Sequence, residues 1–291
     1  MTIYILGFGP ITLQIYRDIV SDGYGATMVT NSAIRRSENL ESLTYAEFCS
    51  LRLTNEDKVI IAWRSLGGST QNTEKEHTIV DLNRNLKYAG KIIYLSSGSV
   101  YGDAENTFTE MMPAAPQTSY AKAKLEIETW LLEIGNPATI ICRISNVFGL
   151  PDLPNLIEKI ITGLGLDEPL RLFDPERFTR DYISVRAVAK SIIFLLLDDE
   201  SQSPYPKFIN ISSNCPTTTT TLMKLVDKAI GYDFSYDVVE IPPGIPVRNC
   251  LDNQKLLDIS KFQFFYSPLD IEDYIQVRLK GFEKRPGKVP R

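Results

Sequence analysis

The sequence of 291 residues predicts an α/β fold, with a doubly wound parallel sheet and a smaller C-terminal part. Three observations indicate this class. Apolar runs alternate with helical stretches through the first half, as in a sheet wrapped by crossover helices. The runs are apolar throughout, which is typical of strands that are buried on both faces. After Gly149 the texture changes to proline-rich, loop-like segments, which predict a smaller second part.

The first half contains five strand candidates, at residues 2–6, 26–30, 58–63, 91–97 and 138–144. Each is short and rich in β-branched residues, as buried parallel strands are. Helical stretches lie at residues 12–23 and 78–90, and both end at glycine. A further helix is expected at residues 222–230, where the last threonine of a threonine run, Thr221, can act as the N-cap.

Composition limits the classes of function. The net charge of −5 argues against a general nucleic-acid binder, which normally shows a basic balance. His77 is the only histidine, so we expect neither a histidine base nor a metal site. The four cysteines are widely spaced, which argues against a disulfide framework; they are Cys49, Cys142, Cys215 and Cys250.

The apolar run at residues 192–197 is too short to span a bilayer, which takes about 20 residues. The N-terminus also lacks the charged start and long apolar stretch of a signal peptide. We therefore expect a cytoplasmic protein with no membrane partner.

The turn after the first strand candidate reads GFGPIT, at residues 7–12. Gly7 and Gly9 would let the backbone approach a pyrophosphate, and the following helix would offer it free N–H groups. Thr12, however, takes the place of the third glycine of a G-x-G-x-x-G loop, and Pro10 and Leu13 depart from the wider G-x-x-G-x-x-G pattern. The segment is either a degenerate dinucleotide loop or a tight turn that binds nothing.

The end of the second strand candidate bears on the choice of cofactor. An acid there usually binds the ribose of NAD, whereas arginine suits the 2′-phosphate of NADP. Here Asn31 and Ser32 stand in the place of the acid, and Arg35 and Arg36 follow. This favours NADP over NAD, with the alternative that the arginines only solvate a loop.

Two stretches in the middle of the chain carry the chemistry. Ser97 ends the strand candidate KIIYLSS and so lies at the carboxyl edge of the sheet, where ligands of α/β folds bind. Tyr120 and Lys124 follow in SYAKAK; being four residues apart, they share one face of a helix. A Y-x-x-x-K spacing alone is common by chance, so its context decides.

That context resembles the extended short-chain dehydrogenases/reductases of the NAD(P)-dependent epimerase/dehydratase family, which act on nucleotide sugars. The resemblance is carried by SSGSVYG at 96–102, Glu110 and Pro116 ahead of SYAKAK, CRISNVFG at 142–149 and RDYISV at 180–185. FINISS at 208–213 and Arg248 with LDNQKLL extend it over nearly the whole chain.

The resemblance implies that Tyr120 exchanges a proton with the substrate oxygen, that Ser97 hydrogen-bonds the same oxygen, and that Lys124 binds the nicotinamide ribose. A tyrosine that acts as a base at pH 7 needs its pKa lowered by about 3 units. We expect the charges of Lys124 and of an oxidised nicotinamide to act in that direction.

The resemblance also implies two binding sites. The cofactor site is expected to comprise Gly7, Gly9, Pro10, Ile11, Asn31, Ser32, Arg35, Arg36, Ala62, Trp63, Ser96, Tyr120 and Lys124. The substrate site is expected to comprise Ser97, Asn146, Arg180 and Arg248, because two guanidiniums suit a diphosphate. The alternatives are that Asn146 only fixes a turn and that Arg180 pairs with Asp181 or another acid.

These sites divide the chain into two expected domains. Residues 1–150 with 178–213 would form a Rossmann-type NAD(P)-binding domain, and residues 151–177 with 214–291 a smaller nucleotide-sugar domain. Relatives often associate through the helix that carries the tyrosine, so we expect a homodimer.

Departures from the family pattern guide the choice of reaction. Gly98 and Ser99 follow Ser97 where dehydratases carry an acid, which argues against dehydration. A 4-ketoreductase and an epimerase remain, and the missing acid at the second strand end favours the reductase. A non-catalytic dinucleotide-sensing protein is a third reading, because the glycine loop is degenerate. Two other departures concern the fit of the cofactor: Trp63 stands where small residues often contact it, and neither Asn72 nor His77 aligns with the family asparagine.

Overall fold

The structure is a computed structural model that describes residues 1–31, 40–64, 82–151, 153, 155–164, 170–198, 206–231, 236–260 and 268–283. Contacts divide the chain into two compact units. The first unit comprises Met1–Val100, Ser119–Arg143 and Ala189–Ile209; the second comprises Tyr101–Thr118, Ile144–Val188 and Asn210–Arg291. These bounds differ from those of the expected domains, since four segments expected in the first domain fall in the second unit: residues 101–118, 144–150, 178–188 and 210–213.

The first unit is built on a seven-stranded sheet with the order β10-β6-β5-β4-β1-β2-β3. Its strands are β1 (Ile3–Leu6), β2 (Ala26–Val29), β3 (Ser42–Leu43), β4 (Lys58–Ile61), β5 (Lys91–Leu95), β6 (Thr139–Ile144) and β10 (Phe208–Ile211). The α/β class with a parallel sheet is confirmed. All five strand candidates are strands, each one or two residues shorter than expected.

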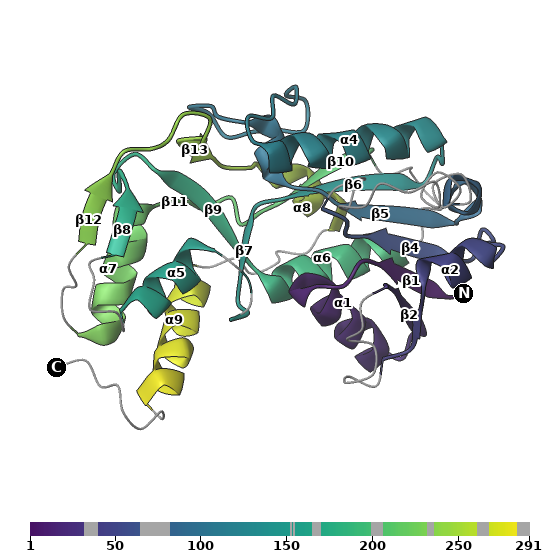
Figure 1. The fold of residues 1–291 in the computed structure, drawn as a ribbon, viewed down its shortest axis with the longest axis horizontal. Helices are drawn as coiled ribbons and strands as arrows, with labels where there is room; N and C mark the ends of the chain where they lie inside the picture. The colour runs from purple at the N-terminus through teal and green to yellow at the C-terminus, as the bar shows by residue number, and fades with distance from the viewer. Residues whose placement is uncertain are drawn as a thin grey trace. The chain divides into compact units, whose positions relative to one another are not determined.

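Helices cover both faces of this sheet: α4 (Ser119–Ile134) lies on one side, and α1 (Pro10–Ser21) and α6 (Val185–Leu197) lie on the other (Figure 1). The short helix α2 (Tyr45–Ser50) precedes β4. Helix α1 begins two residues before its expected start, because proline is well suited to the first helical position. Of the helix expected at 78–90, residues 82–88 are helical, and residues 78–81 lie outside the described part.

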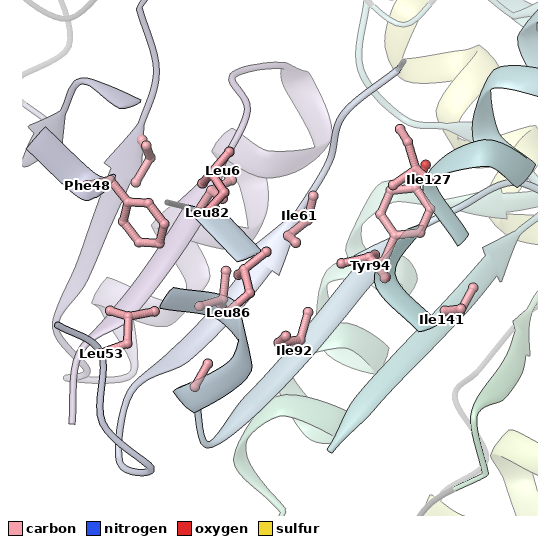
Figure 2. Close-up of a cluster of buried hydrophobic side chains, with 14 residues drawn as sticks. Leu6, Phe48, Leu53, Ile61, Leu82, Leu86, Ile92, Tyr94, Ile127 and Ile141 are labelled. Carbon is pink, nitrogen blue, oxygen red and sulfur yellow. The ribbon is translucent and has the colours of Figure 1, made fainter. Parts of the chain in front are cut away.

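The apolar core on the α4 side fixes the strands beneath the candidate site. Figure 2 shows the side chains of this cluster, with Tyr94 of β5 next to Ile127 of α4. Tyr94 and Ile127 are fully buried, as is Ile141 of β6. Buried side chains of this size contribute about 1.5–3 kcal/mol each, so the core holds α4 firmly on the sheet.

The second unit contains two smaller sheets. One joins β7 (Asn146–Phe148), β9 (Thr179–Ser184), β11 (Pro216–Thr218) and β13 (Arg248–Asn249), and the other pairs β8 (Leu170–Phe173) with β12 (Tyr236–Val239). The helices that lie wholly within this unit are α5 (Leu156–Gly163), α7 (Thr219–Ile230), α8 (Gln254–Ser260) and α9 (Pro268–Glu283). Within the described ranges, no helix of the chain combines the length and apolarity needed to cross a bilayer.

The N-cap of α7 corrects one expectation. Thr218, and not Thr221, caps the helix, and its hydroxyl accepts a hydrogen bond from the Thr221 N–H at 3.1 Å. The helix begins three residues earlier than its apolar pattern indicates, because threonines can occupy a first turn once another threonine caps it.

Candidate active site

The turn after β1 can be made only by glycine. Gly7 has φ +106°, and a Cβ there would lie 3.3 Å from the carbonyl oxygen of Ala62 and 3.5 Å from Cδ1 of Trp63. The positive φ disfavours residues with a Cβ, and the Ala62 carbonyl would have to shift slightly to make room for one. The end of β4 therefore lies against the glycine turn.

The missing third glycine of this turn has a structural explanation. The hydroxyl of Thr12 accepts a hydrogen bond from the Gly9 N–H at 2.9 Å and donates one to the Gly9 carbonyl at 3.0 Å. Pro10 has no N–H to offer. The N–H groups of Ile11 and Thr12 are the next donors at the start of α1, so this helix presents a narrower anion site than a three-glycine loop would.

The end of β2 carries one of the residues on which the expected choice of cofactor depends. Asn31 is exposed, and its Oδ1 accepts a hydrogen bond from the Tyr45 N–H at the start of α2, at 3.2 Å. The amide thus replaces an acid with a neutral group. Ser32, Arg35 and Arg36 lie outside the described residues, as do Asn72 and His77.

Trp63 forms the wall at the end of β4. Its indole N–H donates to the Tyr45 hydroxyl at 2.6 Å, and its ring stacks on Trp130 of α4 with centroids 5.7 Å apart. The Trp130 indole donates to Asn83 at 2.9 Å. This stacking of Trp63 on Trp130 explains why a tryptophan stands at a position where the family resemblance implies a small residue.

The serines after β5 have separate roles. Ser97 accepts hydrogen bonds from the Ser99 N–H at 3.2 Å and from the Ser99 hydroxyl at 3.0 Å. Ser96 is buried instead, and its hydroxyl donates to Glu128 of α4 at 2.5 Å. The Ser96 side chain is therefore engaged inside the unit, whereas Ser97 is only half-buried.

Tyr120 and Lys124 lie in the first two turns of α4. The Lys124 ammonium is buried and donates to the carbonyl oxygens of Trp63 and Leu95, each at 2.7 Å. It lies 5.0 Å from the centroid of the Tyr94 ring and 5.9 Å from that of Tyr120. The structure thus brings Ser97, Tyr120 and Lys124 together in the first unit.

The electrostatics differ from expectation in one respect. Burial raises the pKa of Tyr120, whereas a hydrogen bond with Ser97 and the charge of Arg64 lower it. Burial, and then Arg64, lower the pKa of Lys124 to about 7, against the opposing effect of Glu128. The cation that lowers the pKa of Tyr120 is therefore Arg64 and not the expected Lys124, whose ammonium donates to two carbonyl oxygens.

Tyr120 is 42% exposed, yet its phenol oxygen lies deep enough for burial to govern its pKa. Arg64 is a neighbour that the sequence reading did not identify as a site residue. The only signal was a cation directly after the strand 58–63, at the edge where ligands bind.

The expected substrate residues lie in the second unit. Arg180 stacks on Phe178 at 3.8 Å, and its guanidinium donates to the carbonyl oxygens of Thr179, Val247 and Pro246. In these bonds Arg180 braces a loop and does not pair with Asp181. The alternative expected from the sequence, an ion pair between Arg180 and Asp181, is therefore not formed.

Two further substrate candidates belong to the same unit. Asn146 donates to the Asp181 carbonyl at 3.3 Å, which fixes β7 beside β9. The Nε of Arg248 is buried without a hydrogen-bond partner among the described residues, and its backbone N–H donates to Asp103 at 2.8 Å. Arg248 therefore retains a donor for a ligand.

The second unit also contains a cavity of about 650 Å³ that the sequence did not predict. Its lining includes two aromatic rings, two cations, one acid and three polar side chains, from Phe173, Phe178, Lys159, Arg171, Glu158, Asn155, Thr162 and Thr219. Aromatic rings beside cations suit a planar ring that carries a phosphate. The one signal in the sequence was the asparagine that precedes an apolar run after two prolines, here the N-cap of α5.

Comparison with known proteins places these features in context. Residues 68–212 match the model of the NAD dependent epimerase/dehydratase family. The dTDP-4-dehydro-6-deoxyglucose reductase of Escherichia coli is 28% identical over 145 residues, which cover 47% of this chain and 44% of the relative. The chain thus spans about half the length of the curated relatives that it matches.

Solved structures cover nearly all of the chain. The UDP-glucuronic acid 4-epimerase of Bacillus cereus, in complex with UDP-glucuronic acid and NAD, superposes with a TM-score of 0.78 at 17% identity and covers 97% of this chain and 100% of its own. The UDP-glucose 4-epimerase of Thermotoga maritima with UDP-glucose gives a TM-score of 0.75 at 21% identity, covering 98% and 99%. At these identities the likeness shows the fold.

Ser97, Tyr120 and Lys124 all lie within the matched residues 68–212, whereas the glycine turn lies before them. The chain belongs to the NAD dependent epimerase/dehydratase family.

Proposed function

We propose that the chain is an NAD(P)-dependent oxidoreductase that reduces the 4-keto group of a nucleotide sugar. The observation that carries the proposal is the grouping of three residues: Ser97 acts on the pKa of Tyr120, and the buried Lys124 ammonium lies 5.9 Å from the Tyr120 ring. Because burial raises the pKa of Tyr120, its phenol carries a proton at neutral pH. A protonated phenol suits an acid, which reduction of a ketone requires.

The residues of the first unit fit a nicotinamide dinucleotide. The glycine turn offers a close backbone approach, α1 offers N–H groups, and Lys124 offers a buried cation. Once bound, the cofactor supplies or accepts the hydride. Asn31 in place of an acid supports NADP, whereas the Bacillus cereus epimerase holds NAD.

In this proposal Tyr120 donates its proton to the substrate oxygen as that oxygen gains negative charge. Ser97 hydrogen-bonds the same oxygen and keeps it within reach of the phenol. The phenolate that remains needs a nearby positive charge, which Arg64 supplies. Lys124 adds to this charge only below its pKa of about 7, where it carries a proton.

The proposed substrate is a nucleotide sugar. In the second unit the cavity lined by Phe173, Phe178, Lys159 and Arg171 supports binding of the nucleotide part. Asn146, Arg180 and Arg248 stay proposals for binding the diphosphate; the buried, unpartnered Nε supports Arg248 most. The Escherichia coli relative is named for a dTDP sugar and the two epimerases for UDP sugars, so the base is left open.

An epimerase is the second candidate, because both solved structures described above are 4-epimerases that match nearly the full chain. An epimerase oxidises and reduces the same carbon and retains its cofactor. A reductase consumes one reduced cofactor in each turnover, so the stoichiometry of cofactor consumption separates the two.

We also propose a homodimer through α4, where the Leu132 side chain is 39% exposed. Light scattering would test this oligomeric state.

The deciding experiment combines binding and turnover. The chain is titrated with NADPH and NADH and then incubated with dTDP-4-dehydro-6-deoxyglucose, UDP-glucose or UDP-glucuronic acid. We expect saturable binding and consumption of NADPH in step with the appearance of alcohol. Interconversion of a UDP sugar without net consumption would favour the epimerase. Binding without any turnover would favour a dinucleotide sensor, and absence of binding would contradict all three readings.

A further inference from the structure

A buried ion pair lies directly behind the candidate proton-transfer site. Glu128 of α4 is 1% exposed and Arg143 of β6 is 4% exposed. Arg143 donates to both carboxylate oxygens, through Nη2 at 2.7 Å and Nε at 3.2 Å. Its guanidinium also lies 4.5 Å from the ring of Phe208, so the pair is closely surrounded.

The same carboxylate holds the end of β5. The Ser96 hydroxyl donates to Glu128 at 2.5 Å, and the next residue is Ser97. Glu128 also stands one helical turn after Lys124 and two turns after Tyr120. One side chain therefore joins the strand end that carries the serine to the helix that carries the tyrosine and the lysine.

A purely stabilising role is a weak explanation for this pair. Removing two charges from water costs several kcal/mol per ion, and apolar residues of similar volume often stabilise as well or better. What a bidentate, hydrogen-bonded pair supplies is a fixed geometry. The proton step needs such geometry, because an error of about 1 Å can cost about 100-fold in rate.

We propose that Glu128 is a positioning residue of the Ser97, Tyr120 and Lys124 site: it holds the end of β5 against α4 through Ser96 while Arg143 fixes its carboxylate. This inference rests on the proposed function, because it concerns the same proton transfer. Glu128 acts through its neighbours and need not touch the substrate.

The charge of Glu128 has a second effect, on Lys124. Lys124 is faced by Arg64 after β4, by the Tyr94 ring on β5, and by Tyr120 and Glu128 on its own helix. Of these groups, Arg64 lowers the pKa of Lys124 and Glu128 raises it. Loss of the carboxylate charge should therefore let Lys124 lose its proton at lower pH.

Two variants separate position from stability. The double variant Glu128→Gln/Arg143→Met removes both charges and keeps similar volumes, so its Tm should stay near that of the unchanged protein. We expect its kcat to fall about 10- to 100-fold. The decrease of kcat at high pH should also begin at a lower pH than in the unchanged protein. Glu128→Asp keeps the charge and shortens the reach by one methylene, so its kcat should fall without this shift to lower pH.

Arg278→Gln is the matched control. In the second unit Arg278 donates to both oxygens of Glu158, at 2.8 and 3.2 Å, in an ion pair of the same form. Breaking it should lower Tm and leave the pH dependence of kcat unchanged. A double variant with the kcat and pH profile of the unchanged protein would overturn the inference, as would a loss of kcat that only follows the folded fraction. If the unchanged protein binds cofactor but turns nothing over, the proposed function fails and this inference fails with it.

Discussion

The ammonium of Lys124 lies 2.7 Å from the carbonyl oxygen of Trp63, so the end of β4 holds the lysine of the proton-transfer site directly. The Trp63 side chain packs beside the glycine turn at the same time, with Cδ1 3.5 Å from where a Gly7 Cβ would lie. One residue therefore connects the phosphate end and the nicotinamide end of the proposed cofactor site. A substitution in the glycine turn should therefore alter the surroundings of Lys124, and a substitution of Lys124 should alter the glycine turn.

The first prediction concerns Tyr120. Replacement by phenylalanine removes the hydroxyl that pairs with Ser97 and leaves the ring in place. We expect kcat to fall about 100- to 10,000-fold, the usual contribution of a positioned acid, with little change in cofactor affinity. Tyr88→Phe is the control, because Tyr88 is 61% exposed, and it should turn over normally. Equal kcat in the two variants would remove Tyr120 from the mechanism.

The second prediction concerns stability and pH. Burial lowers the pKa of Lys124 from 10.5 to about 7, so the folded chain gives up a proton that the unfolded chain keeps between these values. Where the unfolded state binds more protons, the free energy of unfolding rises with pH. The unchanged protein should therefore gain stability over Lys124→Met from about pH 7 to about pH 10, by at most about 1.4 kcal/mol per pH unit.

Urea unfolding of both proteins at several pH values measures this difference. Lys122→Met is the control for loss of a cation from the same helix, because Lys122 is exposed. A constant difference between the unchanged protein and Lys124→Met across this range would show that Lys124 stays protonated throughout.

The sequence predicts what depends on local spacing. The strand candidates follow from short, continuous apolar runs, and the shared helix face of Tyr120 and Lys124 follows from the helical period of 3.6 residues. It does not predict partners that lie far apart in the chain. The bond between Trp63 and Lys124 joins residues 61 positions apart, and that between Ser96 and Glu128 joins residues 32 apart. No periodic pattern encodes such pairs, because they depend on how the strands are ordered.

Thr12 illustrates the same limit at short range. In the sequence, Thr12 at the position of the third glycine indicates that the dinucleotide-binding loop is lost. In the structure its hydroxyl satisfies both backbone groups of Gly9, so the turn keeps its form. Side-chain hydrogen bonds of this kind are one of several options for threonine, and the sequence does not say which is taken.

The third prediction uses tryptophan fluorescence. Trp63 and Trp130 are the two tryptophans of the chain, and they stack on each other beside the proposed cofactor site. A bound reduced nicotinamide absorbs where tryptophan emits, so NADPH should quench the emission with saturation. Titration with NADPH and NADH in parallel gives two values of Kd. Tighter NADPH binding would agree with Asn31 in place of an acid; tighter NADH binding would contradict the NADP preference.

The fourth prediction separates the fit of the glycine turn from its backbone strain. Gly7 and Gly23 both have positive φ, at +106° and +85°, so alanine at either position should cost about 1–2 kcal/mol of stability. Only at Gly7 would the new Cβ meet other atoms, 3.3 Å from the Ala62 carbonyl; at Gly23 nothing lies within 4 Å. Gly7→Ala should therefore also push β4 from the turn and disturb Trp63.

We expect Gly7→Ala to lose the saturable quenching by NADPH and Gly23→Ala to retain it, although both unfold at lower urea concentration than the unchanged protein. The two tryptophans are present in both variants, so a lost signal reports binding and not the probe. If both variants bind NADPH as the unchanged protein does, the glycine turn does not hold the cofactor. If both lose binding, general destabilisation explains the loss, and the close approach at Ala62 has no special role.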